Sequence, residues 1–477
     1  MKEESDRALQ RTAVFVAAMA SFMTPFMGSA VNIAVPAIGR QFSMNAVQLG
    51  WVATSYMLAA AVFLIPFSRM ADIVGRKKVF TVGILVQTLG SLLAALAPSG
   101  ALLLAFRVVQ GVGGAMIFGT GVAILTSVFP PRERGRALGV NVAAVYLGLS
   151  LGPVIGGLLT QYLSWRAVFF VHLPIGAAVL VLIFWKLKGE WAEARGEGFD
   201  WAGAILYGLT LVALIVGLSR LPAPKGAWLI GASAAGLCVF VVWESRTAQP
   251  LLDIRLFRRN RVFAFSNLAA LIHYSATACV GFLLSLHLQY IKGFSPRNAG
   301  LVLVVQPIMM ALFSPKAGRL SDRVEPRIVA SAGMGLTFVG LVLLTRLLNG
   351  QTPTALIALC LMLLGLGFAL FSSPNTNAVM SSVERRHFGV ASGTLSTMRA
   401  VGGMLSMGLV MLIFSWIIGP TQITQETPER FPAFVKSAKM ALALASALCL
   451  VGTFASLARG DARKKEPSEE WVDRPEA

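Results

Sequence analysis

One acid and four basic residues stand together in SRMADIVGRKKVF, residues 68–80, in the middle of a long apolar run. A second charged interruption, GRLSDRVEPR, occupies residues 318–327 of another apolar run. The aspartates of the two stretches, Asp72 and Asp322, lie 250 positions apart. In a chain with few charges, this recurrence indicates that one structural unit is present twice.

The composition predicts a protein built of membrane helices. The chain has 477 residues, of which 56% are hydrophobic and 13% are charged, whereas soluble domains contain about 25% charged residues. The apolar runs are about 20 residues long, which lets a helix cross a hydrocarbon core of about 30 Å. They are continuous, so the alternating pattern of a transmembrane β-barrel is absent. We therefore expect an all-α polytopic membrane protein.

Fourteen spans are expected, and an even number places both termini on one side of the membrane. Loops after even-numbered spans carry 21 Lys and Arg residues, and loops after odd-numbered spans carry 10. Because cytoplasmic loops collect basic residues, we expect both termini to be cytoplasmic. The same bias explains the formal net charge of +19 without a nucleic-acid partner. The spans cover residues 12–38, 47–67, 79–97, 101–128, 137–160, 166–186, 201–219, 227–243, 262–290, 298–315, 327–348, 353–373, 389–418 and 437–457.

Further matches at the same offset predict two similar six-span halves. ERGRALGV (133–140) and ERRHFGV (384–390) both open a span, and Gly152 and Gly402 are also 250 positions apart. Parallel six-span repeats are a known transporter architecture. The expected segments are a cytoplasmic N-terminal tail (1–11), a six-helix bundle (12–187), a hydrated cytoplasmic linker (188–200), two extra transmembrane helices (201–243), a basic cytoplasmic linker (244–261), a second six-helix bundle (262–457) and a cytoplasmic C-terminal tail (458–477).

Three motifs of the first half carry a family resemblance. SRMADIVGRKK (68–78) resembles the loop between spans two and three of the Major Facilitator Superfamily, and RVVQGVGGA (107–115) resembles its fourth-span motif. GLSLGPVIGG (148–157) resembles the fifth-span motif of its antiporters. The two extra spans and residues 373–403 are similar to the fourteen-span branch of drug:proton antiporters. The resemblance covers residues 12–457 and implies proton-coupled efflux by alternating access.

The chain departs from the family pattern at several positions. Ser68 replaces the first loop glycine, Ile73 replaces a basic residue, and Glu325 stands where the first copy has Gly75. The stretch FMGSAVNIAVP resembles the first-span motif of the branch, but Met27 stands where that motif has an acid. The last departure puts proton coupling in question.

The two charged loops are expected to act as a conformational latch. A carboxylate at a helix end can meet the positive end of a neighbouring helix and can pair with an arginine. The resemblance implies that such contacts hold the cytoplasmic side shut and favour the outward-facing state. An ordinary basic loop with a helix-end acid is the alternative. The latch residues are Asp72, Gly75, Arg76, Lys77, Gly318, Asp322 and Arg323.

The fifth span combines regularly spaced glycines with a proline. Gly148, Gly152 and Gly156 recur every four residues and share one helix face, which allows a neighbouring helix to approach closely. Pro153 interrupts the helical hydrogen bonds. With Gly157 these residues form the antiporter motif, which the resemblance assigns to a helix that flexes during exchange. Generic packing is the alternative.

Other polar residues lie within or near the ends of spans. A membrane arginine such as Arg107 usually faces the bundle interior or a wet cavity, and Gln110 falls close to the same face. The resemblance ties this arginine to proton transfer; an arginine that extends outward to the interface is the alternative. The amides among the remaining candidates could instead hydrogen-bond between helices. The candidates for cavity or coupling are Asn32, His273, Tyr274, Gln306, Asn375, Asn377 and Arg399.

No acid is expected in the middle of the membrane, because all 22 Asp and Glu residues fall in tails, loops or helix ends. The buried ionisable residues would be Arg107, His273 and Arg399, which favours neutral or anionic substrates over cations. His273 is the best remaining proton carrier, because only imidazole titrates near neutral pH. A neutral histidine hydrogen-bonded between helices is one alternative, and proton transfer by the loop acids Asp72 and Asp322 is another.

Several protein classes are excluded by what the sequence lacks. It contains no phosphate loop of a nucleotide-driven pump and no cytoplasmic stretch long enough for a catalytic domain. The four cysteines are too far apart for a zinc site or a disulfide framework, so we expect no cofactor, no metal and no enzyme. We expect a monomeric secondary transporter in the bacterial inner membrane that exchanges a small molecule for protons. Export of a specific metabolite or lipid, and a transport-inactive sensor or scaffold, are the alternatives.

Overall fold

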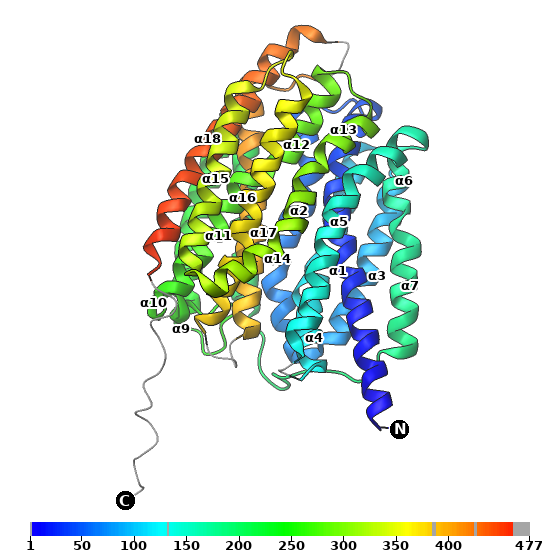
Figure 1. Ribbon diagram of the computed structural model, residues 1–477, viewed down its shortest axis with the longest axis vertical. Helices are drawn as coiled ribbons and strands as arrows, with labels where there is room; N and C mark the ends of the chain where they lie inside the picture. The colour runs from blue at the N-terminus through cyan, green and yellow to red at the C-terminus, as the bar shows by residue number, and fades with distance from the viewer. Residues whose placement is uncertain (1, 131–132, 384–387, 424–426, 461–477) are drawn as a thin grey trace, which may run out of the picture.

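The computed structural model describes residues 2–130, 133–383, 388–423 and 427–460. Within these ranges, fourteen helical spans are long and apolar enough to cross a membrane, which confirms the expected number. The first helix begins and the last helix ends at the same end of the molecule (Figure 1). We call this the termini end and the other the opposite end.

The first six spans form one bundle. The sixth span consists of two helices that adjoin at Val171. The expected tail at residues 1–11 is instead helical from Lys2 onward, because KEESDRALQR contains no glycine or proline to end a helix. The helices of the first bundle are α1 (Lys2–Gln41), α2 (Ala46–Val74), α3 (Arg76–Ala95), α4 (Gly100–Val128), α5 (Arg134–Tyr162), α6 (Trp165–Phe170) and α7 (His172–Lys186).

The last six spans form the second bundle. Its first span contains a π-helical turn, η1 (His287–Ile291), after α11 (Arg261–Thr277) and α12 (Cys279–Leu286). Residues 384–387 of the ERRHFGV repeat and residues 461–477 of the C-terminal tail lie outside the described residues. The other helices are α13 (Pro296–Leu303), α14 (Val305–Arg323), α15 (Pro326–Leu347), α16 (Thr354–Ser381), α17 (Phe388–Ile417), η3 (Pro428–Arg430) and α18 (Phe431–Ala458).

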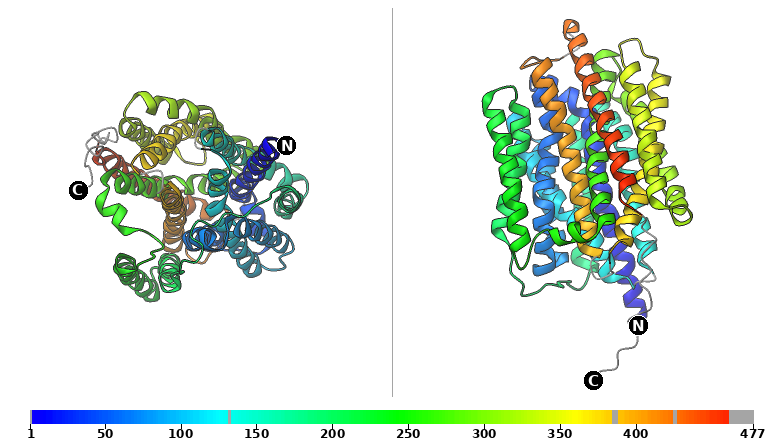
Figure 2. Two further views of the ribbon diagram at one scale, coloured as in Figure 1. Left: turned by 90° about the horizontal axis from the view of Figure 1, so that it is seen from below. Right: turned by 90° about the vertical axis from the view of Figure 1, so that its left-hand side faces the viewer.

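The two extra spans lie at the edge of the molecule (Figure 2). They are α8 (Trp201–Arg220) and α9 (Pro224–Arg246), and the short helix α10 (Ile254–Arg259) leads from them into α11. α8 contacts both bundles. Its Tyr207 hydroxyl donates to the carbonyl of Ala61 on α2 at 3.1 Å, and Ile215 and Leu218 pack against Gly408 of α17.

Side-chain caps fix several helix starts. At α2, the Asn45 side chain accepts from the Gln48 N–H and the Gln48 side chain accepts from the Asn45 N–H, each at 2.9 Å. This reciprocal box satisfies two backbone donors that the first helical turn leaves free. At α4, α8 and α11 the N-cap side chain, a serine, an aspartate and an asparagine respectively, accepts a hydrogen bond from a backbone N–H of the first turn. The helix starts are therefore encoded locally, whereas their packing is not.

Candidate functional site

The loop between α2 and α3 consists of a single residue outside the helices, Gly75. Its φ of +129° lies in the region that favours glycine. The turn leaves Asp72 and Arg76 in contact, and Arg76 Nε donates to Asp72 Oδ1 at 2.8 Å. The expected pairing of this acid with an arginine is therefore formed within one bundle.

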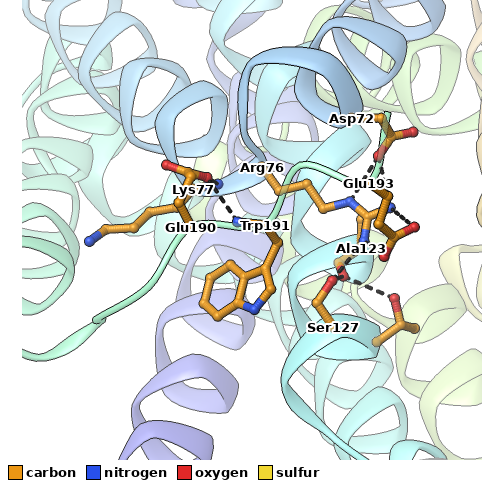
Figure 3. Close-up of polar contacts among 9 residues, drawn as sticks. Asp72, Arg76, Lys77, Ala123, Ser127, Glu190, Trp191 and Glu193 are labelled. Carbon is orange, nitrogen blue, oxygen red and sulfur yellow. Dashed lines mark hydrogen bonds and ion pairs between the residues drawn. The ribbon is translucent and has the colours of Figure 1, made fainter. Parts of the chain in front are cut away.

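The linker after the sixth span is bound to this loop (Figure 3). Glu193 accepts two hydrogen bonds from the guanidinium of Arg76, at 2.7 and 2.9 Å, and the same guanidinium donates to Ser127 Oγ at 2.6 Å. Glu190 accepts from the backbone N–H of Lys77 at 2.8 Å. We call residues 190–197 the linker strap.

Backbone contacts continue along the linker strap. The Arg76 N–H donates to the carbonyl of Trp191 at 2.8 Å, and the Ala194 N–H donates to the carbonyl of Asp72 at 2.9 Å. Glu197 forms an ion pair with Arg69. The sequence indicated a hydrated linker here, and the structure corrects this: much of it is docked, because its acids match the basic loop.

The second charged loop differs from the first. Asp322 and Arg323 occupy the last turn of α14 at the termini end, and Gly318 lies one turn earlier against Ser373 of α16. Glu325, where the first copy has Gly75, forms an ion pair with Arg327 at 2.7 Å. The two loops are thus alike in position, but the second has Glu325 and its ion pair where the first has Gly75.

The glycines of α5 pack directly on α1. A Cβ at Gly148 would lie 2.5 Å from the Phe22 carbonyl oxygen, and one at Gly152 would lie 2.9 Å from the carbonyl oxygen of Phe26. A Cβ at Gly156 would contact Ala30 at 2.8 Å. The expected shared face and close helix approach are therefore present, and the neighbour is α1 of the same bundle.

Another side of α5 faces the second bundle. A Cβ at Gly157 would lie 2.6 Å from the carbonyl oxygen of Pro296, and one at Gly300 would lie 2.1 Å from that of Pro153. The motif thus lets α5 approach α1 on one side and α13 on the other. Any movement of the two bundles relative to each other near this place must change the contact between α5 and α13.

The opposite end is closed by hydrogen bonds between the bundles. Pro36 has no N–H, so the carbonyl of Asn32 loses its helical donor, and Ser285 Oγ donates to that carbonyl at 2.6 Å. Gln289 Nε2 donates to the carbonyl of Ile33 at 3.0 Å. Sequence reasoning missed Gln289, because it lies in the π-helical turn, which shifts the faces of an ideal helix. It missed Ser285 because the partner is a carbonyl of α1 that lies 253 residues earlier in the chain.

Arg107 lies in the interior of the first bundle with 1% of its surface exposed. Its Nε donates to the Val52 carbonyl at 3.1 Å, and its Nη1 donates to Gln110 Oε1 at 2.8 Å. Gln110 Nε2 donates to Ser91 Oγ at 2.7 Å, and the guanidinium lies 4.6 Å from the Tyr56 ring centroid. This network joins α2, α3 and α4, so the arginine does not extend outward.

A second group of polar side chains lies where the bundles meet. Arg399 Nη2 donates to Thr376 Oγ1 at 2.6 Å, and its guanidinium lies 5.8 Å from the ring centroid of Tyr274. Ser314 Oγ donates to the hydroxyl of Tyr146 at 2.9 Å, which links α14 to α5. We call these five residues the central polar cluster. Their one formal charge is that of Arg399.

His273 does not face this cluster, contrary to expectation. Its side chain is fully buried in the second bundle, and its ring centroid lies 4.1 Å from that of Phe371 and 5.2 Å from that of Phe368. Neither ring nitrogen has a hydrogen-bond partner in the part of the chain that is described. The interhelical hydrogen bond weighed as the alternative is not seen either. The half-buried neighbour Tyr274 faces the cluster instead.

Two candidate amides hydrogen-bond between helices. Asn375 Nδ2 donates to the Ser266 carbonyl at 3.1 Å, and Asn375 Oδ1 accepts from Arg459 at 3.0 Å. Asn377 Nδ2 donates to Ser321 Oγ on α14 at 2.8 Å. These contacts lie near the termini end, and they hold helices of the second bundle together.

The remaining positions lie apart from the central polar cluster. Gln306 is half-buried on α14, and its carbonyl is close to Gly365 of α16. Met27, which stands where an acid is expected, is fully buried in α1. Glu244, which was expected to begin the basic linker (244–261), lies in the last turn of α9, is only 2% exposed and accepts from the Leu252 N–H at 3.0 Å. It belongs to the base of α9, away from the bundle interface.

The comparison with family models identifies the fold. Residues 17–407 and 266–475 match the model described as Major Facilitator Superfamily. The chain belongs to this superfamily. Its fourteen spans agree with the fourteen-span branch, and its two six-helix bundles plus two extra helices are the superfamily fold with one inserted pair.

Relatives across the superfamily differ in what they carry. The cephamycin export protein CmcT of Amycolatopsis lactamdurans is 33% identical over 450 residues, which cover 91% of each chain. The riboflavin transporter RibZ of Clostridioides difficile is 29% identical over 434 residues, which are 90% of this chain and 93% of RibZ. The multidrug resistance protein Stp of Mycobacterium tuberculosis is 32% identical over 396 residues, which are 81% of this chain and 73% of Stp.

Solved structures share the fold at low sequence identity. A bacterial homolog of the human lysosomal transporter Spinster, in an inward-facing and unoccupied conformation, has a TM-score of 0.68 with 14% identity over 94% of this chain and 97% of its own. The human organic anion transporter MFSD10 has a TM-score of 0.62 with 15% identity over 94% of this chain and 99% of its own. With the family match and the curated relatives, the protein is a multi-pass membrane transporter of small molecules.

Proposed function

We propose that this transporter is a proton-coupled exporter that works by alternating access in the bacterial inner membrane, with the termini end cytoplasmic. The excess of basic residues in the even-numbered loops supports the orientation. The α5 motif supports efflux over uptake, as do the names of CmcT, an export protein, and Stp, a multidrug resistance protein. The substrate class is drugs or other small molecules.

The observation that carries this proposal is the closure of the opposite end. With the termini end cytoplasmic, the hydrogen bonds from Ser285 and Gln289 to α1 close the outer side. The structure then corresponds to the inward-facing state, in which an exporter collects its substrate. In this state Arg76 of the first loop is bound by the linker strap and not by a residue of the second bundle.

The first loop is proposed to engage the second bundle when the inner side closes. Asp72 keeps 34% of its side-chain surface exposed, although it pairs with Arg76. Its carboxylate therefore remains accessible to the positive end of an approaching helix. The latch then acts in the outward-facing state, and the linker strap holds the loop in the inward-facing state.

The charges of the interior favour neutral or anionic substrates. Arg399 is half-buried in the central polar cluster, and Arg107 is fully buried inside the first bundle. No carboxylate belongs to either network among the described residues. A site of this charge repels cations, because few counter-charges screen it in a low-dielectric interior.

Proton coupling is assigned to the Arg107 network. The burial of His273 among phenylalanines leaves it without a hydrogen-bonded route to the bundle interface. Arg107, Gln110 and Tyr56 form instead a buried polar group inside the first bundle, joined by one hydrogen bond and one cation–π contact. Export of one specific metabolite is the second candidate function, because RibZ is named for a single compound.

A growth assay tests the proposed export. An efflux-deficient bacterium that expresses this chain is challenged with anionic, neutral and cationic compounds, and an Arg399→Gln variant serves as the comparison. We expect protection against anionic or neutral compounds, and reduced protection against the anionic ones in the variant. Protection confined to cations would overturn the substrate assignment, and protection by neither protein against any compound would favour a single-metabolite exporter or a scaffold.

A further inference from the structure

The short helix α10 presents three arginines on one face. Arg255, Arg258 and Arg259 follow the spacing of one helix side and are all exposed. None of them takes part in an ion pair with another described residue. The neighbouring acid, Asp253, uses Oδ1 to accept from the Arg255 N–H at 3.0 Å. The face therefore carries concentrated positive charge at the termini end.

An apolar groove of about 290 Å³ lies beneath this helix. Its walls come from α10, α11 and α17, and it follows α11 from Ala264 to Leu271, about 10 Å into the span at 1.5 Å per residue. That is about a third of a hydrocarbon core of 30 Å. The lining residues are Phe257, Ala264, Phe265, Leu268, Leu271 and Met398.

The charge and the groove are joined at the first turn of α11. Arg261 lies with its guanidinium carbon 5.5 Å from the ring centroid of Phe265, which lines the groove. Its Nε donates to the carbonyl of Ala458 at 3.0 Å, and this contact holds the side chain in place. On the other wall, Phe257 projects from the same helix as the exposed arginines. One molecule could therefore contact the arginines and the groove together.

We propose that this place binds one anionic phospholipid, with its phosphate at the α10 arginines and Arg261 and an acyl chain in the groove. The arginines supply donors for phosphate oxygens, and the groove offers no polar side chain to water. A zwitterionic lipid would fit the groove but not the charge. In the proposed orientation this lipid belongs to the inner leaflet, yet binding itself does not depend on the transport reaction.

The test is native mass spectrometry of the full chain released from mixed micelles. Dioleoyl phosphatidylglycerol and dioleoyl phosphatidylcholine are the two probes. We expect one phosphatidylglycerol to bind about tenfold more tightly than phosphatidylcholine, because several arginines act on one phosphate. Changing Arg255, Arg258 and Arg259 together to Gln should abolish this preference. Ala264→Phe, which fills the groove, should weaken the binding of both lipids.

Matched variants separate this site from a general attraction of cations. Arg136 and Lys186 of the first bundle and Lys188 of the linker that follows it are exposed cations at the same end. Changing these three to Gln removes equal charge. We expect this control to keep the preference, and the unfolding temperature of each variant in detergent reports on folding. Equal binding of the two lipids by the wild type would overturn the proposal. An equal loss of the lipid preference in the control triple variant would also overturn it. So would a folded Ala264→Phe variant that binds both lipids as the wild type does but no longer binds a second copy of the chain.

Discussion

Arg76 at the start of α3 forms a bidentate ion pair with Glu193, which lies 117 residues further along the chain. Arg76 is 5% exposed, whereas 69% of the Glu193 side chain is exposed. The linker strap therefore covers the loop that the sequence assigns to a latch. This contact ties the loop between α2 and α3 to the segment that leads into α8.

Glu193→Gln should loosen the linker strap without unfolding the transporter. Because Glu193 is largely exposed, water screens the pair, and the loss should stay below about 1 kcal/mol. We expect faster amide hydrogen exchange in residues 187–199. Arg195→Gln, an exposed cation in the same segment, is the control. Equal exchange rates in Glu193→Gln and wild type would show that the ion pair does not hold the strap.

Asp72→Asn should weaken transport while expression stays normal. The change removes a helix-end charge interaction of about 0.3–1 kcal/mol at an exposed site, and up to about 2 kcal/mol when partly buried. The population should shift towards the inward-facing state, so single cysteines at the termini end should label faster. Unchanged labelling together with unchanged transport would count against the latch.

Gly152→Leu should give an inserted but inactive protein. Even a Cβ at this position would lie 1.9 Å from Ser29 Oγ and 2.9 Å from the Phe26 carbonyl oxygen. Gly139 lies on the same helix with nothing within 4 Å of a Cβ, so Gly139→Leu is the matched control. Membrane insertion and flux are measured for both. Wild-type flux in Gly152→Leu would reduce the motif to packing without a role in movement.

Ser285→Ala combined with Gln289→Leu should open the opposite end. Each change removes a neutral hydrogen bond between the bundles, of about 1 kcal/mol, so the equilibrium should shift about 30-fold towards the outward-facing state. Spin labels on α2 and α17 near this end report the distance between the bundles. Ser415→Ala is the control, because Ser415 bonds to the Leu221 carbonyl and not across the two bundles. A distance distribution like that of wild type would refute the gating role.

Much of the first bundle could be predicted from residue spacing. The four-residue repeat of Gly148, Gly152 and Gly156 defined a helix face before any neighbour was known, and that face packs on α1. Arg107 and Gln110 are three positions apart and form a hydrogen bond. In both cases the residues are three or four positions apart on one helix, so the helical repeat alone places them on the same face.

Other features depend on contacts distant in sequence. His273 and Tyr274 are neighbours, and their side chains point in directions about 100° apart around the helix. Hydropathy alone does not show which of the two points into the second bundle and which points towards the first. The acids at residues 190–197 indicated only a hydrated linker, because their basic partners precede them by more than 100 residues. The role of Ser285 became visible only from the carbonyl that Pro36 leaves free on α1.

Proton-driven accumulation in proteoliposomes tests the central proposal most directly. Transporter oriented with the termini end outward is given riboflavin, an organic carboxylate or a lipophilic cation outside, with an acidic lumen. The account predicts accumulation of the neutral or anionic compound above equilibrium, its collapse with a protonophore, and its loss in Arg107→Gln but not in His273→Gln. Equal movement with and without the pH gradient, or accumulation of the cation alone, would contradict it.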